Sequence, residues 1–264
     1  MLRFATILLA LMLSFSAFAE GADSVAVKPK SQYPVFGMWR NSYFATGASL
    51  DRPLSKYSTD VKFQLSLGLR LWNIKGKADI FFTYSQHSVW DIYQKSCPFR
   101  ETAYNPGVWA AWQVNKQVRL LFGIEHESNG QKDELSRSFN YATVACLYEA
   151  FDHWRFGGRV WYGYYDHDTM HTYYAYRGVF NLWATYHTLN ERFSATALIN
   201  PSNYFRNYNI QLEAAWKMAK RGDWIPSLYV QFSSGYGDTM LDYDRYHCKV
   251  RIGVSLMNNK LGLY

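Results

Sequence analysis

The sequence predicts an all-β protein, a twelve-stranded antiparallel transmembrane β-barrel, and three observations support this prediction. Apolar and polar residues alternate with a period of two along most of the 264-residue chain, as they do in strands with two unlike faces. Beyond residue 19, the chain lacks the run of about 20 apolar residues that a membrane helix needs. Aromatic and charged residues each make up 19% of the chain, which excludes a disordered polypeptide and is poorer in charge than a typical soluble domain.

The N-terminus has the pattern of an export signal. Met1–Arg3 is a short positive region, an apolar run follows over Ala5–Phe15, and Ser16–Ala19 ends in the small-x-small pattern that signal peptidase cleaves. The apolar run is too short for a transmembrane anchor. We therefore expect a signal peptide over residues 1–19.

The rest of the chain divides into an arm and a barrel. Residues 20–36 are polar and contain Pro29 and Pro34, which predicts an extended N-terminal periplasmic arm. The barrel then occupies residues 37–264. Its clearest strand lies over 61–71, where every odd position is apolar and every even position is polar or glycine, so one face is suited to lipid.

Similar alternating stretches recur along the barrel region. An even number of strands suits a bacterial barrel, and closure satisfies every backbone hydrogen bond inside lipid. Each stretch is close to the roughly 9–11 residues that cross a bilayer at a tilt. The twelve expected strands are 38–45, 60–72, 77–90, 103–113, 117–128, 138–149, 155–164, 174–186, 192–199, 205–217, 226–236 and 246–257.

The connections between these strands alternate in length. Short turns are expected at 73–77, 115–116 and 220–223, and longer polar loops at 46–59, 91–100, 129–137, 165–173 and 237–245. Barrels of the bacterial outer membrane have short periplasmic turns and longer external loops. The sequence therefore predicts a multi-pass protein of that membrane.

Charge and cysteine content limit the partners. The formal charge is +7, but Lys and Arg are scattered, without the basic run that nucleic-acid binders carry. We expect contact with outer-membrane lipid, whose anionic headgroups attract a basic protein, and no nucleic-acid partner. Cys97, Cys146 and Cys248 lie in separated segments, and the sequence leaves open whether two of them join.

Two polar residues interrupt the apolar face of the expected strand 117–128. His126 and Ser128 continue the face that Ile124 belongs to, and side chains at i and i+2 share one side of a strand. Polar side chains on a lipid-facing surface need an explanation. One alternative is that the strand has already left the hydrocarbon at this point, so that both residues are merely interfacial.

The next expected strand favours a catalytic interpretation. A hairpin through residues 129–137 would place Asn140 beside His126 on the same outer face. In that arrangement His126 takes the hydroxyl proton of Ser128, and the Asn140 side-chain oxygen accepts the other imidazole N–H. A nucleophile that faces lipid implies a lipid substrate.

These residues resemble the outer-membrane phospholipase A family, whose signature reads HxSNG followed by SRSxN. The matching segments here are His126–Gly130 and Ser136–Asn140. Order and spacing both agree, and the resemblance extends over residues 80–257. Three further segments are similar to that family: Tyr84–Gln86, Ser96–Pro106, and Ser234–Asp238 together with Leu241–Tyr243.

The resemblance implies an enzyme that hydrolyses acyl esters of phospholipids and lysophospholipids at both acyl positions, requires calcium and is active as a homodimer. It implies that Ser128 is the nucleophile, His126 the base and Asn140 the orienting residue. The oxyanion would be bound by the Ser128 backbone N–H and by water that calcium polarises.

The calcium positions that the resemblance implies are oxygen donors, as calcium prefers. They are the Ser136 hydroxyl, the Gln131 carbonyl, the Asp133 carboxylate, the carbonyl of Ser96 of the partner subunit, and a second carboxylate from the 165–173 loop, either Asp168 or its alternative Asp166.

Gln86 supports the dimer from a different direction. It lies on the outward face of the expected strand 77–90, between Tyr84 and Ser88. An amide in lipid needs a partner, which a second subunit would supply, and the resemblance places the matching Gln at the dimer contact. The alternative is an interfacial Gln that is hydrogen-bonded to a neighbouring strand.

Two other functions are weighed against this one. A lipid A deacylase also carries HxS on a barrel exterior, but such barrels are shorter and use Glu where Asn140 stands here. A porin or structural barrel would need an open lumen, which inward charges would obstruct: Lys62, Arg70, Arg119, Glu125 and Glu127.

Overall fold

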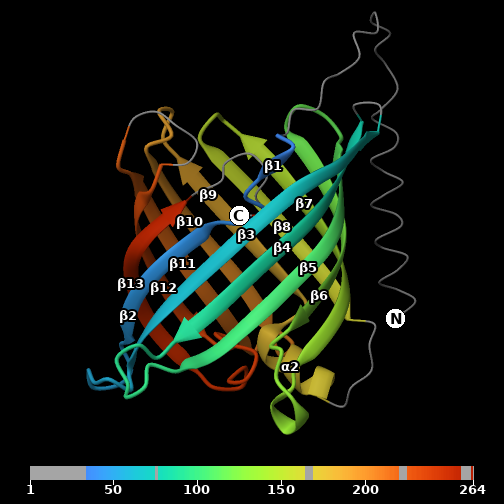
Figure 1. The fold of residues 1–264 in the computed structure, drawn as a ribbon. Helices are drawn as coiled ribbons and strands as arrows, with labels where there is room; N and C mark the ends of the chain where they lie inside the picture. Colours follow the sequence, from blue (N-terminus) through green and yellow to red (C-terminus); the bar gives the residue numbers. More distant parts are fainter. Residues whose placement is uncertain (1–33, 75–76, 164–168, 220–224, 257–262, 264) are drawn as a thin grey trace, which may run out of the picture. The chain divides into compact units, whose positions relative to one another are not determined.

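Twelve long strands, each antiparallel to its neighbours in sequence, close into a β-barrel (Figure 1). The fold is taken from a computed structural model that describes residues 34–74, 77–163, 169–219, 225–256 and 263. The strands are β2 (Ser42–Ser49), β3 (Thr59–Ile74), β4 (Ala78–Trp90), β5 (Phe99–Gln113), β6 (Val118–Ser128), β7 (Ser138–Ala150), β8 (Trp154–Gly163), β9 (Phe180–His187), β10 (Phe193–Ser202), β11 (Asn207–Lys217), β12 (Ser227–Gly235) and β13 (His247–Leu256).

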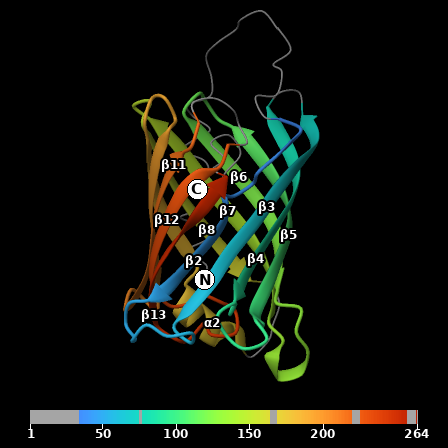
Figure 2. The ribbon, with the colours of Figure 1, turned by 60° about the vertical axis from the view of Figure 1, so that its left-hand side comes forward.

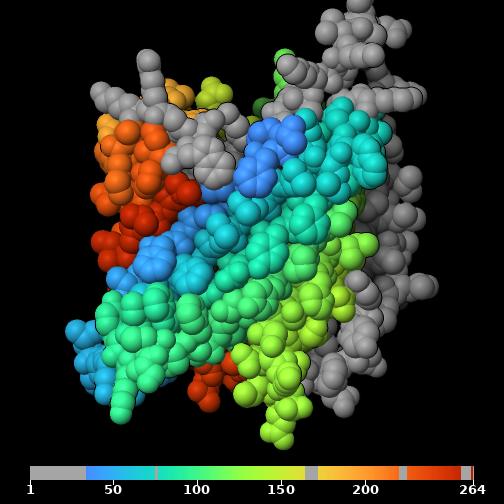
Figure 3. Space-filling view, viewed as in Figure 1, coloured from blue at the N-terminus to red at the C-terminus, as the bar shows by residue number. Residues whose placement is uncertain are grey.

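The barrel closes where β13 pairs with β2, with Leu256 opposite Ser42. Neighbouring strands run side by side and tilted across the face in Figure 3. Because every long strand has a neighbour on both sides, no sheet edge is left with unpaired backbone groups in lipid. Among the described residues, no helix is long and apolar enough to cross a membrane. The fold class predicted from the sequence is confirmed.

The two ends of the barrel differ in loop length, as expected. The connections 114–117, 151–153 and 188–192 are short and lie at one end. The opposite end carries the β6–β7 loop with a single 3-10 turn, η1 (Asp133–Leu135), and the helix α2 (Thr169–Arg177). Both views place α2 and the β6–β7 loop together at this end (Figures 1 and 2). The expected signal peptide at 1–19 and residues 20–33 of the expected arm lie outside the described residues.

The first expected strand, 38–45, is wrong in its position. A two-residue strand, β1 (Phe36–Gly37), pairs with β3 near Leu69, and β2 begins only at Ser42. Between them Trp39 turns into the barrel, where its ring lies 5.3 Å from that of Trp109 and is almost fully buried. The gain from burying this ring explains why the strand is interrupted there.

The eighth expected strand, 174–186, is also wrong in its first part. Residues up to Arg177 belong to α2, and β9 starts at Phe180. The helix ends at Gly178, which has a φ of 66° and donates its N–H to the Tyr174 carbonyl at 2.9 Å. A glycine in this left-handed conformation is a common helix terminator, whereas the Tyr-rich sequence before it suggests a strand.

The alternation in β3 extends to Leu71, the last residue of the expected alternating stretch. A bulge shifts the register between Arg70 and Trp72, and both Leu71 and Trp72 are exposed. A bulge places two residues of one strand opposite one residue of its partner. Leu71 and Trp72 therefore both face outward, and the outward apolar stripe continues past Leu69 to Trp72.

Gly123 on β6 is required by a close contact inside the barrel. A Cβ at this position would lie 2.4 Å from Cδ2 of Trp109, whose ring is completely buried. We expect Gly123→Ala to lower the free energy of unfolding by about 1–3 kcal/mol, because a rigid buried indole must move. Gly158→Ala is the control, since its Cβ would lie 3.0 Å from the flexible Cδ2 of Leu182. Equal losses in urea unfolding would contradict this explanation.

Candidate active site

The end of β6 places His126 and Ser128 on the outer face of the barrel. Their neighbours Glu125 and Glu127 point inward and are buried, while Ile124 on the outer face is 61% exposed. His126 and Ser128 are each partly buried. The alternation expected from the sequence therefore continues to the last residue of the strand, and two polar side chains lie on a surface that is otherwise apolar.

The strand β7 brings Asn140 beside His126. The register pairs His126 with Asn140 and Ser128 with Ser138. The Nδ1 atom of His126 lies 2.9 Å from Oδ1 of Asn140. When Nδ1–H donates to this oxygen, the Nε2 atom carries the lone pair that can accept a proton. Within the described part of the chain, no hydrogen bond joins the Ser128 hydroxyl to the His126 ring.

Asn129, which follows Ser128 directly, fixes the β6–β7 loop. Its side-chain oxygen accepts the backbone N–H groups of Gln131 at 3.2 Å and Arg137 at 2.9 Å. Its Nδ2 atom donates to the Leu135 carbonyl at 2.8 Å. Asn129 is almost fully buried, so this loop is ordered from within by one side chain.

The expected calcium donors of this loop are all exposed. Gln131, Asp133 and Ser136 lie within six residues of one another, and the Ser136 N–H donates to the Asp133 carbonyl at 3.0 Å. Among the hydrogen bonds of the described residues, none ends on the Gln131 carbonyl or on the Asp133 carboxylate. Ser96 is exposed in the β4–β5 loop with a φ of 67°, while Asp166 and Asp168 lie outside the described residues.

These donors are chemically suited to calcium. Carbonyl, hydroxyl and carboxylate oxygens are the ligands that calcium prefers, and here they are exposed on a loop whose conformation Asn129 fixes. Across the ranges that the structure describes, no group of three or more His, Cys, Asp or Glu side chains is placed to bind a metal. A calcium ion here would therefore depend on backbone and hydroxyl oxygens as much as on carboxylates.

Gln86 lies on the outer face of β4, in line with Ser128. The register pairs Gln86 with Tyr104 on β5, and Tyr104 with Ser128 on β6. The Tyr84 hydroxyl donates to Oε1 of Gln86 at 3.0 Å, so the amide has a partner on its own strand. The interfacial alternative, in which Gln86 bonds to a neighbouring strand, has no such contact among the described residues.

The interior of the barrel contains side chains that sequence reasoning did not single out. Asn105 on β5 is buried, and its Nδ2 atom donates to the backbone carbonyl of His126 at 2.8 Å. The sequence signal for this role was the Asn105-Pro106 pair inside an alternating strand. Proline removes a backbone donor from the ladder, so a neighbouring side-chain amide can donate in its place. Arg40 was also overlooked; its guanidinium forms an ion pair with Glu125 at 2.9 Å.

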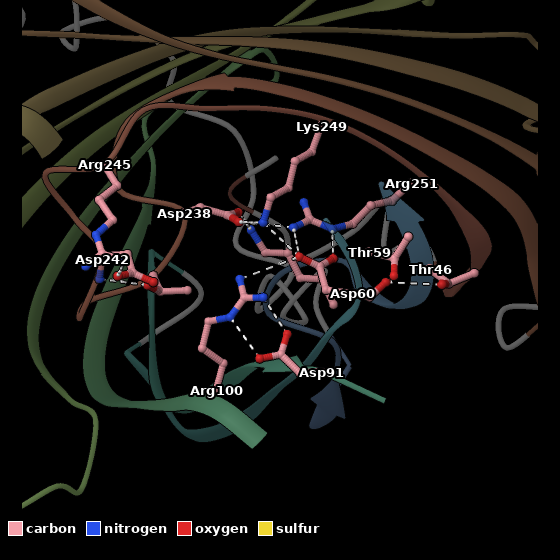
Figure 4. Close-up of polar contacts among 12 residues, drawn as sticks. Thr46, Thr59, Asp60, Asp91, Arg100, Asp238, Asp242, Arg245, Lys249 and Arg251 are labelled. Atoms are coloured by element: carbon pink, nitrogen blue, oxygen red, sulfur yellow. Dashed lines mark hydrogen bonds and ion pairs between the residues drawn. The ribbon is translucent and has the colours of Figure 1, made fainter. Parts of the chain in front are cut away.

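A charged network lies in the lumen near the end that carries the longer loops (Figure 4). Arg251, fully buried, bonds to Asp60 at 2.8 Å and to Asp238 at 3.0 Å. Lys249 contacts the same two carboxylates, at 2.7 Å and 3.0 Å, and Lys62 lies 2.7 Å from Asp238. The lumen at this level is occupied by side chains that are bonded to one another, which disfavours a porin.

The three cysteines are free thiols. Cys97 and Cys146 are exposed and Cys248 is partly buried. The question that the sequence left open, whether two of them form a disulfide, is thus answered in the negative for this structure.

Comparison with known protein sequences gives one consistent group of relatives. A family model described as phospholipase A1 matches residues 30–256. Phospholipase A1 of Escherichia coli strain K12 is 30% identical over 219 residues, which cover 79% of this chain and 73% of that protein. Putative phospholipase A1 of Neisseria meningitidis serogroup B is 29% identical over 225 residues, which cover 76% of this chain and 55% of that protein.

Comparison with solved structures gives the same fold. Outer membrane phospholipase A from Escherichia coli matches with a TM-score of 0.74 at 24% identity, covering 85% of this chain and 99% of that one. The Salmonella typhi outer membrane phospholipase dimer with bound calcium also matches with a TM-score of 0.74 at 24% identity, covering 88% of this chain and 99% of that one.

Proposed function

Since the chain belongs to the phospholipase A1 family, we propose that it is a calcium-dependent phospholipase that hydrolyses acyl ester bonds of phospholipids and lysophospholipids at both acyl positions. The protein is an outer-membrane β-barrel. The observation that carries the proposal is the 2.9 Å contact between His126 and Asn140, with Ser128 two residues away on the same outer face. A reactive group on this surface meets lipid rather than a soluble substrate.

The proposed mechanism is acyl transfer to Ser128. The Nε2 atom of His126 accepts the hydroxyl proton while the Ser128 oxygen attacks the ester carbonyl. Asn140 accepts the Nδ1–H of His126 at 2.9 Å, which fixes the ring tautomer and orientation. His126 then gives its proton to the leaving alcohol, and a water molecule releases the fatty acid by the same steps. The Ser128 backbone N–H stabilises the developing oxyanion.

The β6–β7 loop supplies the donors for calcium in this proposal. The Ser136 hydroxyl, the Gln131 carbonyl and the Asp133 carboxylate would hold the ion, together with the carbonyl of Ser96 of the partner subunit. Bound there, calcium would act as a Lewis acid that lowers the energy of negative charge developing near Ser128. Asp168, or its alternative Asp166, is the proposed source of a further carboxylate.

Dimerisation is proposed as the control of activity. A single chain would lack the Ser96 donor of the partner subunit, so its calcium site would be incomplete. Gln86 is proposed to lie at the contact, because it shares one outward row with Tyr104 and Ser128. A partner that covers Gln86 would therefore lie directly beside the catalytic residues.

The test is hydrolysis of a mixed phospholipid by the refolded full-length protein in detergent micelles, with millimolar calcium or with a chelator. We expect fatty acid release with calcium and a loss of roughly a hundredfold or more with the chelator, because the charge on the oxyanion is then less stabilised. Magnesium at the same concentration is the control, since its smaller coordination shell fits open carbonyl sites poorly. Equal rates with calcium and chelator would contradict the calcium dependence.

Two further measurements address the other functions. Release of 3-hydroxy fatty acid from purified lipopolysaccharide, with no release from phospholipid, would indicate a lipid A deacylase. Ion conductance of the Ser128→Ala protein across planar bilayers, at the level of a porin, would indicate a channel. We expect neither, because the third residue beside His126 is Asn140 and an ion-pair network obstructs the lumen.

A further inference from the structure

The interior side of the β6–β7 hairpin carries a polar network directly behind the proposed catalytic residues. The register between β5 and β6 pairs Tyr104 with Ser128 and Gly107 with Glu125. The two β5 residues between Tyr104 and Gly107 have no partner in this register. One of these is Pro106, which has no N–H to donate. The Asn105 side chain donates instead to the His126 carbonyl at 2.8 Å. At His126, therefore, a side chain takes the place of a regular ladder bond.

Glu127 links this point to the rest of the network. It lies between His126 and Ser128 in sequence and points into the barrel, where it is buried. The Tyr141 hydroxyl donates to its Oε2 atom at 3.0 Å, and the Asn105 amide donates to the Tyr141 hydroxyl at 3.2 Å. Tyr141 follows Asn140 directly. Each of the three proposed catalytic residues is thus next in sequence to, or bonded through its backbone to, a member of one interior network.

The other end of the network is the external helix α2. Nη1 of Arg177 lies 2.9 Å from Oε1 of Glu127, and the same atom contacts the Tyr173 hydroxyl. The Tyr173 ring packs on Phe139 of β7 with centroids 4.1 Å apart. The helix is therefore bonded to β6 through Arg177 and packed on β7 through Tyr173.

This connection matters because triad chemistry depends on small distances. A displacement of about 1 Å in a reacting group can lower the rate by two orders of magnitude. The ladder between β5 and β6 is incomplete beside His126, while β6 stays paired with β7, so on the β5 side the position of this strand end depends on side chains. Those side chains converge on Glu127, and the cation that forms an ion pair with Glu127 among the described residues comes from α2.

We propose that Asn105, Glu127, Tyr141 and Arg177 form a positioning network, and that helix α2 sets the geometry of His126, Ser128 and Asn140 through the Arg177–Glu127 ion pair. This inference rests on the proposed function of the same site. In the proposal none of the four residues touches the substrate. They act from inside the barrel on a site that lies outside it. A change in the position of helix α2 would therefore change the catalytic rate.

The test compares Arg177→Met with the double variant Glu127→Gln/Arg177→Met. The single variant leaves Glu127 buried without its cation, so both thermal stability and kcat are expected to fall. The double variant removes that charge and is expected to recover the melting temperature. If the network positions the triad, kcat stays lower by about tenfold or more while KM is unchanged, because the contact with α2 is still absent.

Arg159→Met is the matched control. Arg159 is a buried arginine that lines the same cavity as the partly buried Arg177, but it stacks over the Trp161 ring on β8. We expect its kcat to equal that of the wild type. Arg177→Lys, which keeps a cation beside Glu127, is expected to recover most of the lost kcat.

The outcomes separate this inference from the proposed function. If the wild-type protein releases no fatty acid, the proposed function fails. If the wild-type protein is active but kcat of the double variant recovers together with its melting temperature, the ion pair only stabilises the barrel and the positioning role is wrong. The rate at which a fluorophosphonate labels Ser128 gives a second readout, which we expect to fall in the double variant and not in Arg159→Met.

Discussion

Replacing Ser128 with alanine is expected to lower kcat for phospholipid hydrolysis by about a thousandfold or more, since removal of a nucleophile leaves only the contribution of binding and oxyanion stabilisation. Calcium should no longer change the residual rate. The barrel itself should be unaffected, because Ser128 is the last residue of β6 and lies on the outer face. The measurement is fatty acid release from mixed micelles, with the heat-modifiable mobility of the barrel in electrophoresis as the check on folding.

Ser138→Ala is the matched control for this prediction. Ser138 stands directly opposite Ser128 in the register and is a serine of the same hairpin. We expect this variant to retain the wild-type rate, because its hydroxyl has no role in the proposed chemistry. Full calcium-dependent activity in Ser128→Ala would show that another residue is the nucleophile.

The fold and the outer half of the site could be predicted from the sequence because lipid imposes a strict rule. A residue at an outward position must be apolar or must have a reason to be polar, so His126, Ser128 and Gln86 were visible as exceptions. The period of two put Asn140 on the same outer face, and the expected hairpin through residues 129–137 put it beside His126, as in the structure. Functional residues can be predicted from the sequence on a strand face that contacts only lipid, because there any polar residue is an exception.

The interior could not be predicted in the same way. Inward positions are polar for many reasons, and nothing local distinguishes Glu127, which contacts Arg177 of α2, from Glu125, which contacts Arg40. These partners are 50 and 85 residues away in sequence. The helix itself was hidden because its Tyr-rich sequence has strand character, whereas contacts distant in sequence, such as the packing of Tyr173 on Phe139 and the Arg177–Glu127 ion pair, favour the helix there.

Arg251→Met is expected to be the most destabilising single substitution that we consider. Its guanidinium is completely buried and bonds to Asp60 at 2.8 Å and to Asp238 at 3.0 Å. Removing Arg251 breaks its hydrogen bonds to both buried carboxylates, which Lys249 still contacts, and we expect a loss of about 3 kcal/mol. The measurement is the free energy of unfolding in urea at neutral pH. Arg245→Met is the control, because Arg245 is 76% exposed in its pair with Asp242, and we expect it to cost less than about 0.5 kcal/mol.

The pH dependence of this loss gives a second check on its electrostatic origin. Burial would raise the pKa of Asp238, but the neighbouring cations, chiefly Arg251, outweigh it and hold the pKa well below the ordinary 3.8. Because the folded-state pKa is depressed, the stabilisation by this carboxylate is complete above 3.8 and is lost as the pH falls through the depressed value. The difference between wild type and Arg251→Met should therefore be largest near neutral pH and should narrow in acid. A difference that is constant from neutral pH into acid would indicate lost packing rather than lost charge.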